Sequence, residues 1–493
     1  MLNSSTTIEP GNSYFWGPSK CPYSIRTSKL SSPFQVKKTS HTIPILHIEN
    51  HCLWINGEES PSHEILTAIS WYMRKKLDVD LSKVTYNYFS IDNNLLFEIQ
   101  GVSVEGFNKI YYSVISGAGN SFVDYMFFEG KEPPKPDSKP LAALEATKNL
   151  GSESGNMPDQ RSSKMIALKE KYGHDLRCGY LINNYQSITK TISSFGHVHN
   201  CAFATMNAIG VEVIVSQFGS PEHQEYEVPF KYDNIETIIV AENNKKKKAG
   251  VPSRVFQIDE NTFKIQVNLY KSYGTHDPGE GYLASRAYII RKLIPDAIII
   301  VTEHGRDNVY FQRKNNKLIN LLKFVGVTVN MKNYSLTIER NEGIFNKPYW
   351  KYTKTGEKNA SMVLEQLFIK KDFDIIFTNH AGCGKSYIKI NEAFFQPKKT
   401  NGIPDIVAFD KQNNILLVIE GETSKNYHKG LKQVLDPAFD TFIERELVSR
   451  IGNDIIVKKH LCTFGEYKKE SEVIFNLTKD YQMNYNENAV KIK

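Results

Sequence analysis

Two glutamates, Glu420 and Glu422, stand one residue apart at the end of an apolar run, downstream of Pro404-Asp405. The stretch GIPDIVAFDKQNNILLVIEGETSK predicts two strands joined by a turn over residues 410–414. Alternate residues of a strand point to one face, so the two glutamates should project together, and a hairpin brings Asp405 alongside them. Converging carboxylates repel one another unless a cation lies among them, and an all-oxygen cluster suits Mg²⁺. The pattern therefore predicts a Mg²⁺ site with Asp405 and Glu420 as ligands.

This arrangement resembles the PD-(D/E)xK nuclease superfamily, to which most restriction endonucleases belong. The superfamily triad is Asp, then Glu, then Lys two residues after the Glu. Here Glu422 occupies the lysine position, as in some restriction enzymes of the superfamily, and Lys425 could supply the ammonium. The amphipathic run ASMVLEQLFIKK predicts the helix that precedes the catalytic strands, and Glu365 is its candidate metal ligand. An exposed hairpin with ordinary surface acids is the alternative interpretation.

A second constellation of the same kind lies in the N-terminal half. Asp124 stands inside the apolar run SFVDYMFFEG, and Glu145 and Lys148 follow in KPLAALEATKN. Helices are predicted over SPSHEILTAISWYMRKKL, which carries Glu64, and over DQRSSKMIALKEKYG, which carries Arg161. Lys148 is three residues after Glu145 where the superfamily has two, so either the residue before it holds the usual position or a bulge shifts the register. Here the alternative is an ordinary α/β domain with surface ion pairs.

The resemblance implies an α/β fold, with a restriction-endonuclease-like mixed sheet flanked by helices that is present twice in the chain. It implies Mg²⁺ ligands in both cores, namely Glu64, Asp124 and Glu145 in the first and Glu365, Asp405 and Glu420 in the second. Lys148 would stabilise the attacking water or the transition-state charge, whereas Glu422 would act as a general base with Lys425 assisting. Cleavage of a duplex needs one cut on each strand, so two cores in one chain suit an enzyme that makes both cuts. Alternatively, one core is catalytic and the other is structural or linked to recognition.

The 493-residue length allows two to four domains. We expect an irregular segment over residues 1–45, a nuclease-like α/β domain over 46–340 with a recognition insert near 180–250, a linker over 341–357, and a second nuclease domain over 358–493. Strand-like stretches are expected at 201–217 and 235–240, and a strand at 297–302 should complete the first α/β layer. In GHVHNC, the alternation of His197, His199 and Cys201 fits either a soft-metal site on a strand or a plain half-buried strand.

The formal net charge of +7 permits nucleic-acid binding but does not require it. A lysine block and a mixed polar stretch at 306–317, RDNVYFQRKNNK, are the candidate DNA contacts, although such blocks are also typical of solvated loops. The residues that we expect to contact DNA are Lys245, Lys246, Lys247, Lys248, Arg306, Arg313 and Lys314.

Other features bear on where the protein works. The sequence has no apolar run long enough for a transmembrane helix, no basic-then-apolar signal layout at its start, and six scattered cysteines without a CxxC pair. We therefore expect a cytoplasmic protein without a membrane partner.

The resemblance to the PD-(D/E)xK superfamily implies a type II restriction endonuclease that makes Mg²⁺-dependent, sequence-specific double-strand cuts in DNA by phosphodiester hydrolysis, and the other observations are compatible with it. A companion DNA methyltransferase is the expected partner in a restriction-modification system, and the sequence leaves open whether the enzyme is a monomer or a homodimer. A DNA repair or recombination nuclease and a non-catalytic DNA-binding protein are the alternatives.

Overall fold

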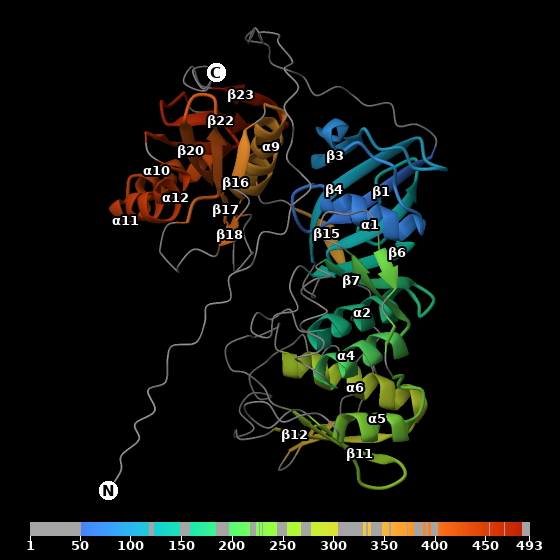
Figure 1. Ribbon diagram of the computed structural model, residues 1–493. Coiled ribbons are helices and arrows are strands. Elements are labelled where there is room, and N and C mark those ends of the chain that lie inside the picture. Colours follow the sequence, from blue (N-terminus) through green and yellow to red (C-terminus); the bar gives the residue numbers. More distant parts are fainter. Residues whose placement is uncertain are drawn as a thin grey trace, which may run out of the picture. The chain divides into compact units, whose positions relative to one another are not determined.

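The protein is a mixed α/β protein with several sheets, described by a computed structural model (Figure 1). The chain divides into two compact units, the first comprising residues 43–354 and the second containing residues 355–493. The structure describes residues 51–117, 123–147, 158–183, 197–216, 223–225, 227–228, 230–243, 254–267, 278–303, 329–331, 334–336, 348–353, 356–371, 373–378, 388–390, 393–395, 403–452, 454–467 and 469–485.

The first unit contains a ten-stranded mixed sheet. Its strand order is β2-β3-β4-β1-β5-β6-β7-β8-β9, with β15 joined to β4. The strands are β1 (Cys52–Gly57), β2 (Thr85–Ile91), β3 (Asn94–Gln100), β4 (Lys109–Gly117), β5 (Tyr125–Gly130), β6 (Ala142–Thr147), β7 (Arg177–Asn183), β8 (Val211–Ser216), β9 (His223–Glu225) and β15 (Trp350–Tyr352). Strands β1, β5 and β6 pair antiparallel in that order, β6, β7 and β8 pair parallel, and β9 returns antiparallel to β8.

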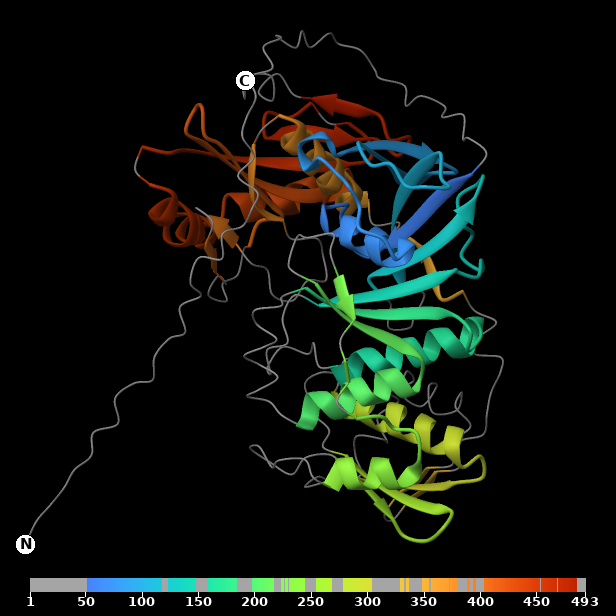
Figure 2. The ribbon, with the colours of Figure 1, turned by 45° about the vertical axis from the view of Figure 1, so that its right-hand side comes forward.

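Helices pack on this sheet and join it to a smaller one. They are α1 (Glu64–Met73), α2 (Pro158–Tyr172), α4 (His197–Ala208), α5 (Ile235–Asn243) and α6 (Pro278–Leu293). Figures 1 and 2 show α2, α4 and α6 side by side between the main sheet and the smaller sheet, and all three pairs of these helices are in contact. The smaller sheet has the order β10-β11-β12-β13-β14. Its strands are β10 (Arg254–Gln257), β11 (Thr262–Val267), β12 (Ile298–Glu303), β13 (Val329–Met331) and β14 (Tyr334–Leu336).

Several expectations for the first unit were wrong. The strand expected at 297–302 exists as β12, but it belongs to the smaller sheet rather than to the main layer. Within the stretch expected to be strand-like at 201–217, residues 201–208 belong to α4, as does the GHVHNC alternation before them, whereas residues 211–216 form the strand β8. The stretch expected to be strand-like at 235–240 lies in α5. Residues 201–206 of α4 are all buried, and a helix buried on every side has no polar face to reveal its period. The region near 180–250 is also not simply an insert, since β8 and β9 complete the main sheet.

The stretch expected to link the two domains contains structure of its own. Strand β15 pairs antiparallel with β4, and Trp350 within it is fully buried in the core of the first unit. Burial of a large indole removes much apolar surface from water, so this short strand is anchored although the stretch around it, 341–357, is mostly polar.

The second unit is built on a six-stranded sheet in the order β16-β19-β20-β21-β22-β23. Its strands are β16 (Asp374–Thr378), β19 (Ile406–Asp410), β20 (Ile415–Thr423), β21 (Ile456–Phe464), β22 (Val473–Leu477) and β23 (Met483–Tyr485), and β17 (Ile388–Ile390) and β18 (Ala393–Phe395) form a separate hairpin. Strands β16, β19 and β20 pair antiparallel, β20, β21 and β22 pair parallel, and β23 returns antiparallel to β22.

Helices lie on both faces of this sheet. They are α9 (Gly356–Lys370), α10 (Tyr427–Val434), α11 (Pro437–Phe442) and α12 (Ser449–Ile451), with a π-helical turn over residues 443–448. A methyl group on Gly421 of β20 would meet Ser361 of α9, whereas one on Gly430 of α10 would meet Glu422 of β20. Because neighbouring residues of a strand point to opposite faces, α9 and α10 lie on opposite faces of β20.

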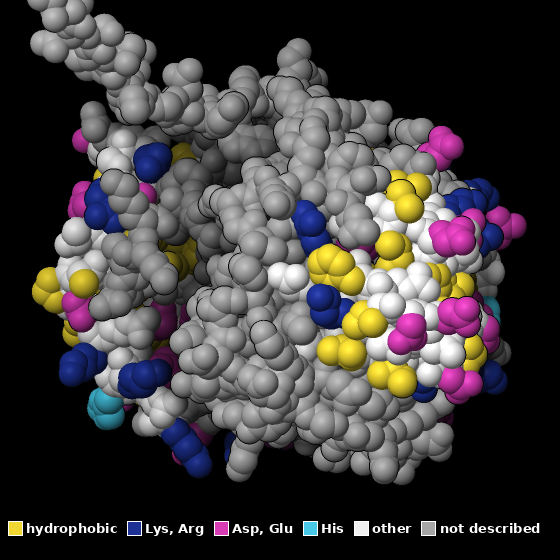
Figure 3. Space-filling view, turned by 90° about the horizontal axis from the view of Figure 1, so that it is seen from below, with side chains coloured by type: hydrophobic (Ala, Val, Ile, Leu, Met, Phe, Trp, Pro, Cys, Tyr) yellow, Lys and Arg dark blue, Asp and Glu magenta, His cyan; other side chains and the backbone are white. Residues whose placement is uncertain are grey.

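The surface of the first unit around the smaller sheet and α5 carries a mixture of hydrophobic, acidic and basic side chains. The exposed large hydrophobic residues around the smaller sheet and α5 are Val240, Ile258 and Ile298. Figure 3 looks at the molecule from this end and shows hydrophobic side chains scattered among acidic and basic ones on the first unit. Scattered apolar residues of this kind are normal on a protein surface. Within the described residues, no helix has the length and apolar content to cross a membrane.

The described cysteines should be inert toward thiol reagents in the folded protein. Cys52, Cys178, Cys201 and Cys462 form no disulfide with one another, and all are buried. Burial raises the pKa of the Cys178 and Cys462 thiols to about 12, so the reactive thiolate is scarce at neutral pH. Alkylation at pH 8 followed by peptide mass mapping should therefore leave these four residues unmodified until urea is added. Rapid labelling of Cys178 or Cys462 in the native protein would contradict this packing.

Candidate functional site: two pairs of strand-end carboxylates

The first unit places Asp124 opposite Glu145 at one end of the β5–β6 hairpin. Tyr125 pairs with Leu144, so the residues immediately outside them, Asp124 and Glu145, face each other in the antiparallel register. The Oδ2 atom of Asp124 accepts a hydrogen bond of 2.6 Å from the backbone N–H of Ala146. This bond ties the aspartate to the strand that carries the glutamate.

Two cations of α2 neutralise Glu145. The glutamate is fully buried, and its Oε1 atom accepts a hydrogen bond of 2.8 Å from Lys164 Nζ and forms an ion pair with Arg161. Arg161 and Lys164 are three residues apart, which places them on the same side of a helix. The Oε2 atom of Glu145 is buried without a hydrogen-bond partner among the described residues.

The electrostatics of Asp124 show how tightly this site is enclosed. The Asp124 side chain is partly buried, and the protein atoms packed around its carboxyl disfavour the charged form. Burial and, after it, the charge of Glu145 raise the pKa of Asp124 to about 8, even though Lys164 and Arg161 oppose both effects. An aspartate in such surroundings resists ionisation unless another cation reaches it.

Further acids border the first site. Glu64 is the first residue of α1, and its charge contributes to raising the pKa of Tyr86 and Tyr125. Glu58 and Glu59 are exposed and follow β1. Their charges contribute to raising the pKa of Tyr112. The sequence had not singled out Glu58 and Glu59, although their position directly after a buried strand is the signal that identified the other acids.

The cation predicted for the first site cannot be compared with the structure, because Lys148 lies outside the described residues. The cations that contact Glu145 come instead from α2, and Lys164 among them was missed in the sequence. The signal was available, since Arg161 and Lys164 share one side of a predicted helix that directly follows the glutamate strand. The expected DNA contacts, Lys245 to Lys248, Arg306, Arg313 and Lys314, also lie outside the described residues.

The second unit repeats this register. Ile406 of β19 pairs with Ile419 of β20, so Asp405 faces Glu420. The Oδ2 atom of Asp405 accepts a hydrogen bond of 2.8 Å from the backbone N–H of Gly421, the residue after the glutamate. The structure therefore brings Asp405, Glu420 and Glu422 together at one end of a hairpin, as the sequence predicted.

The second site is less well neutralised than the first. Gln433 Nε2 donates a hydrogen bond of 2.6 Å to Glu420 Oε1, and Lys429 Nζ donates one of 2.9 Å to Glu422 Oε1. The remaining oxygens, Oε2 of Glu420 and of Glu422, are buried and find no hydrogen-bond partner among the described residues. Burial, followed by the charges of Asp405 and Glu422, raises the pKa of Glu420 to about 9.

Two side chains expected at the second site are replaced by neighbours. Lys425 is exposed in the turn before α10, and the ammonium that contacts Glu422 belongs to Lys429. On α9, the acid whose pKa is raised by burial and by the charge of Glu422 is Glu357, in the first turn of the helix. The predicted ligand Glu365 lies eight residues further along, which corresponds to about 12 Å of helix.

A methyl group added between the two glutamates should disturb this site. At Gly421 a Cβ atom would lie 2.5 Å from Ser361 Oγ and 3.0 Å from Asp405 Oδ2. We expect Gly421→Ala to lower the free energy of unfolding by about 1–3 kcal/mol, the usual cost of overpacking, as measured by urea denaturation of the full chain.

The double variant Ser361→Ala/Gly421→Ala is the matched control for this prediction, because it removes the closer of the two clashing atoms. It should recover part of the loss. Equal stability of Gly421→Ala and the wild type would show that α9 and β20 are further apart than the structure places them.

The carboxylates leave room for a divalent cation without forming a complete cage. Among the described residues, no three His, Cys, Asp or Glu side chains are grouped so that they could hold an ion as they stand. Mg²⁺ keeps several water ligands and is commonly bound by one or two carboxylates together with substrate phosphate. The partnerless oxygens of Glu420 and Glu422 are therefore compatible with such an ion at the second site.

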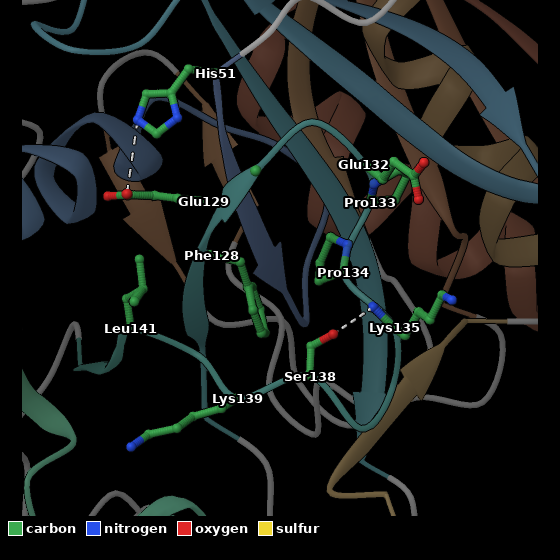
Figure 4. A pocket seen from close by; sticks show the side chains of 11 residues that line it. His51, Phe128, Glu129, Glu132, Pro133, Pro134, Lys135, Ser138, Lys139 and Leu141 are labelled. Carbon is green, nitrogen blue, oxygen red and sulfur yellow. Dashed lines mark hydrogen bonds and ion pairs between the residues drawn. The ribbon is translucent and has the colours of Figure 1, made fainter.

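A surface depression in the described part of the chain lies elsewhere. It has a volume of about 580 Å³ and is lined by the loop between β5 and β6 together with His51, Phe128 and Glu129. Figure 4 shows this loop with the side chains of Lys135 and Ser138, and the ion pair between His51 and Glu129 beside it. The loop joins the hairpin at the end opposite to Asp124 and Glu145, so the depression is not part of the carboxylate site.

Comparisons with known proteins do not add to this picture. No protein-family model matches the chain, and no curated protein or solved structure shows significant similarity to it. The functional interpretation therefore rests on the residues and their geometry.

Proposed function

We propose that the protein is a type II restriction endonuclease, which makes Mg²⁺-dependent, sequence-specific double-strand cuts in DNA. The observation that carries this proposal is the shared register of the two hairpins, in which an aspartate faces a buried glutamate and accepts a hydrogen bond from the residue after it. In both units the glutamate strand is followed by a helix whose polar side chains contact the glutamate, and then by a parallel strand.

The directions of the surrounding strands support the same proposal. Strands β1-β5-β6-β7-β8-β9 and strands β16-β19-β20-β21-β22-β23 follow the same sequence of antiparallel and parallel pairings. Such a mixed sheet with flanking helices is the arrangement that we expect of a restriction-endonuclease-like core, present once in each unit. Similar fold alone does not establish activity, so the carboxylates carry the functional part of the proposal.

In the second unit we assign the chemistry as follows. Asp405 and Glu420 would hold Mg²⁺, which when bound lowers the pKa of a coordinated water and offsets charge on the phosphate. Glu422 would accept the proton of the attacking water, because its Oε2 atom has no other partner among the described residues. Lys429 holds the other oxygen of Glu422 and thereby fixes the orientation of the base. The products would be ends with a 5′-phosphate and a 3′-hydroxyl.

Basic residues beside this site provide a surface for DNA. Lys425, Lys429 and Lys432 are exposed and follow one another at spacings of four and three residues along the turn and α10. This spacing places them on one side, from which ammonium groups can neutralise phosphates without reading the sequence. Their position next to Glu422 would guide the DNA backbone toward the carboxylates.

The cellular setting follows from the proposed chemistry. The proposed substrate is DNA, and the described cysteines form no disulfide, so we propose a cytoplasmic enzyme. A companion DNA methyltransferase would protect the host's own recognition sites.

A plasmid cleavage assay tests the proposal. Pure protein should convert plasmid DNA into discrete fragments with Mg²⁺ and should leave it intact with EDTA. A smear would instead indicate a nonspecific nuclease of the repair or recombination type, and a shifted, uncut band would indicate a DNA-binding protein without catalysis. Either result would overturn the assignment as a restriction enzyme.

The same assay separates the two units. Asp124→Ala and Asp405→Ala are compared singly with the wild type. If each unit makes one cut, each variant should produce nicked circles. If either variant still linearises the plasmid fully, the unit that it alters takes no part in the chemistry.

A further inference from the structure

We infer that the two carboxylate sites differ in kind: the second binds a divalent cation, whereas Arg161 and Lys164 replace that cation in the first. This inference rests on the proposed function for the metal at the second site. It adds that the chain has one metal centre rather than two.

Two cations of the protein itself already contact the buried glutamate of the first site. Asp124 and Glu145 provide two carboxylates, and Arg161 and Lys164 provide two cations that both contact the same glutamate oxygen. The Lys164 side chain is 4% exposed and that of Arg161 is 16% exposed, so water screens these charges little. A guanidinium cannot lose its proton in a protein, so Arg161 remains a cation at any working pH. A divalent ion placed here would face two fixed positive charges at close range.

A buried network keeps these cations in place. Asp159, in the first turn of α2, forms an ion pair with Arg286 of α6, and Arg286 Nε lies 2.9 Å from Glu242 of α5. All three residues are at most 6% exposed. The hydroxyl groups of Tyr232 and Tyr282 donate hydrogen bonds of 2.7 Å and 2.6 Å to Glu242. Since Asp159 lies two residues before Arg161, this network fixes the turn that presents Arg161 to Glu145.

At the second site, the carboxylates outnumber the cations that contact them among the described residues. Asp405, Glu420 and Glu422 provide three carboxylates, and the ammonium that contacts them belongs to Lys429, whose side chain is 73% exposed. Gln433, which contacts Glu420, is neutral. In the contacts that the described residues make, carboxylates therefore outnumber cations at the second site, an excess of negative charge that a divalent cation would reduce.

An independent observation points to a ligand at the second site. Glu420 is 7% exposed and Glu422 is 3% exposed, and each has a buried Oε2 atom without a hydrogen-bond partner among the described residues. Leaving such oxygens without a partner is costly, and a metal ion is one of the few groups that relieves the cost for two carboxylates at once. At the first site, Glu145 also has a partnerless Oε2 atom, but two cations already hold its other oxygen.

This difference has a consequence for cleavage. With one metal centre per chain, a single chain would cut one strand, and a double-strand cut would require two chains or two successive encounters. The first unit would then serve structure or recognition rather than hydrolysis.

Counting bound Mn²⁺ tests the inference without any need for cleavage. Electron paramagnetic resonance measures free Mn²⁺ in titrations of the full chain without DNA. We expect one bound Mn²⁺ per chain in the wild type and in Asp124→Asn, and at least tenfold weaker binding in Asp405→Asn and Glu420→Gln. Circular dichroism of each variant verifies that it is folded.

Two outcomes would overturn the inference: two Mn²⁺ per chain with one lost in each aspartate variant, or no bound Mn²⁺ in the wild type.

A reverse variant tests the cause. Removing both cations in Arg161→Gln/Lys164→Gln should create a second Mn²⁺ site, and a folded double variant that still binds one ion would show that these cations do not exclude the metal.

The proposed function can fail separately from this inference. A wild type that binds one Mn²⁺ but does not cut DNA with Mg²⁺ would end the assignment as a nuclease and leave the asymmetry intact. Conversely, specific cleavage by a chain that binds two Mn²⁺ would keep the nuclease and remove the asymmetry.

Discussion

Replacing Glu420 with glutamine should lower the rate of plasmid cleavage by about a thousandfold or more. Glutamine keeps the size of the side chain and an oxygen that can accept the hydrogen bond from Gln433, but it removes the charge that would hold the cation. Metal-ion catalysis contributes several kcal/mol to the stabilisation of such transition states, and each 1.36 kcal/mol corresponds to tenfold in rate. Single-turnover cleavage of a plasmid with saturating enzyme measures the loss at the chemical step.

The same substitution should make the folded protein more stable when no divalent cation is present. Glu420 is buried beside Asp405 and Glu422, so its charge is costly in the folded state and cheap in the unfolded chain. A neutral glutamine avoids that cost, and we expect a higher urea midpoint for Glu420→Gln than for the wild type in EDTA. A site that opposes stability in this way is typical of functional centres.

Glu444→Gln is a matched control for both measurements. Glu444 lies in the same unit on the π-helical turn and is exposed, so its replacement should change neither cleavage nor stability appreciably. If Glu420→Gln retained more than a tenth of the wild-type rate, Glu420 would not hold a catalytic ion. If it lowered both activity and stability, its role would be structural.

The backbone of both sites could be predicted from the sequence because a simple pattern determines it. In 123–147 and in 403–423, the first apolar run begins directly after an aspartate, Asp124 or Asp405. The second apolar run carries a glutamate near its end, Glu145 or Glu420. The requirement to bury both runs fixes the register of each hairpin, and the register alone places Asp124 opposite Glu145 and Asp405 opposite Glu420. One residue of slippage would have moved the buried side chains to the other face.

The side chains that neutralise these acids could not be predicted in the same way. Long lysine side chains reach the acids from a neighbouring helix, so the contact depends on where that helix crosses the sheet. At the second site this geometry selects Lys429 over Lys425 and Glu357 over Glu365, although each pair lies on one continuous segment. Sequence spacing describes neighbours within an element but says little about the offset between elements.

The helices α4 and α5 were mistaken for strands for a related reason. Residues 201–206 of α4 are all buried, and α5 has nine residues and begins with the apolar run IETIIV. Such a run fits a buried strand or a buried helix equally well. The deciding factor is tertiary: α5 contributes Glu242 to the buried partners of Arg286, which no local pattern reveals.

Replacing Arg286 with methionine should cost the first unit about 3–5 kcal/mol of unfolding free energy, the typical penalty for removing one partner of a buried ion pair. Methionine fills much of the space but leaves Asp159 and Glu242 as buried acids without their cation. Glu242 would keep its hydrogen bonds from Tyr232 and Tyr282, whereas Asp159 would lose its ion pair. The loss should therefore appear first at the beginning of α2.

Tryptophan fluorescence during urea unfolding measures this loss in the relevant unit. Trp54, Trp71 and Trp350 all belong to the first unit, and residues 355–493 contain no tryptophan. The fourth tryptophan, Trp16, lies outside the described residues, so a Trp16→Phe background confines the signal to the first unit. Arg74→Met is the control, because Arg74 forms an exposed ion pair with Glu212 and such pairs contribute about 1 kcal/mol or less. Arg286→Lys should fall between the two, since lysine keeps the charge but cannot reach both acids with a planar fork.

The double variant Glu242→Gln/Arg286→Met separates the ion pair from simple packing. If the buried charge of Glu242 causes the loss, neutralising it should recover part of the stability, and the two substitutions should not be additive. If Arg286→Met alone cost less than about 1 kcal/mol, the acids would be compensated by other groups, and the fixed position of α2 could no longer be ascribed to this network. In that case Arg161 and Lys164 would be free to move away from Glu145, and the first site could admit a cation after all.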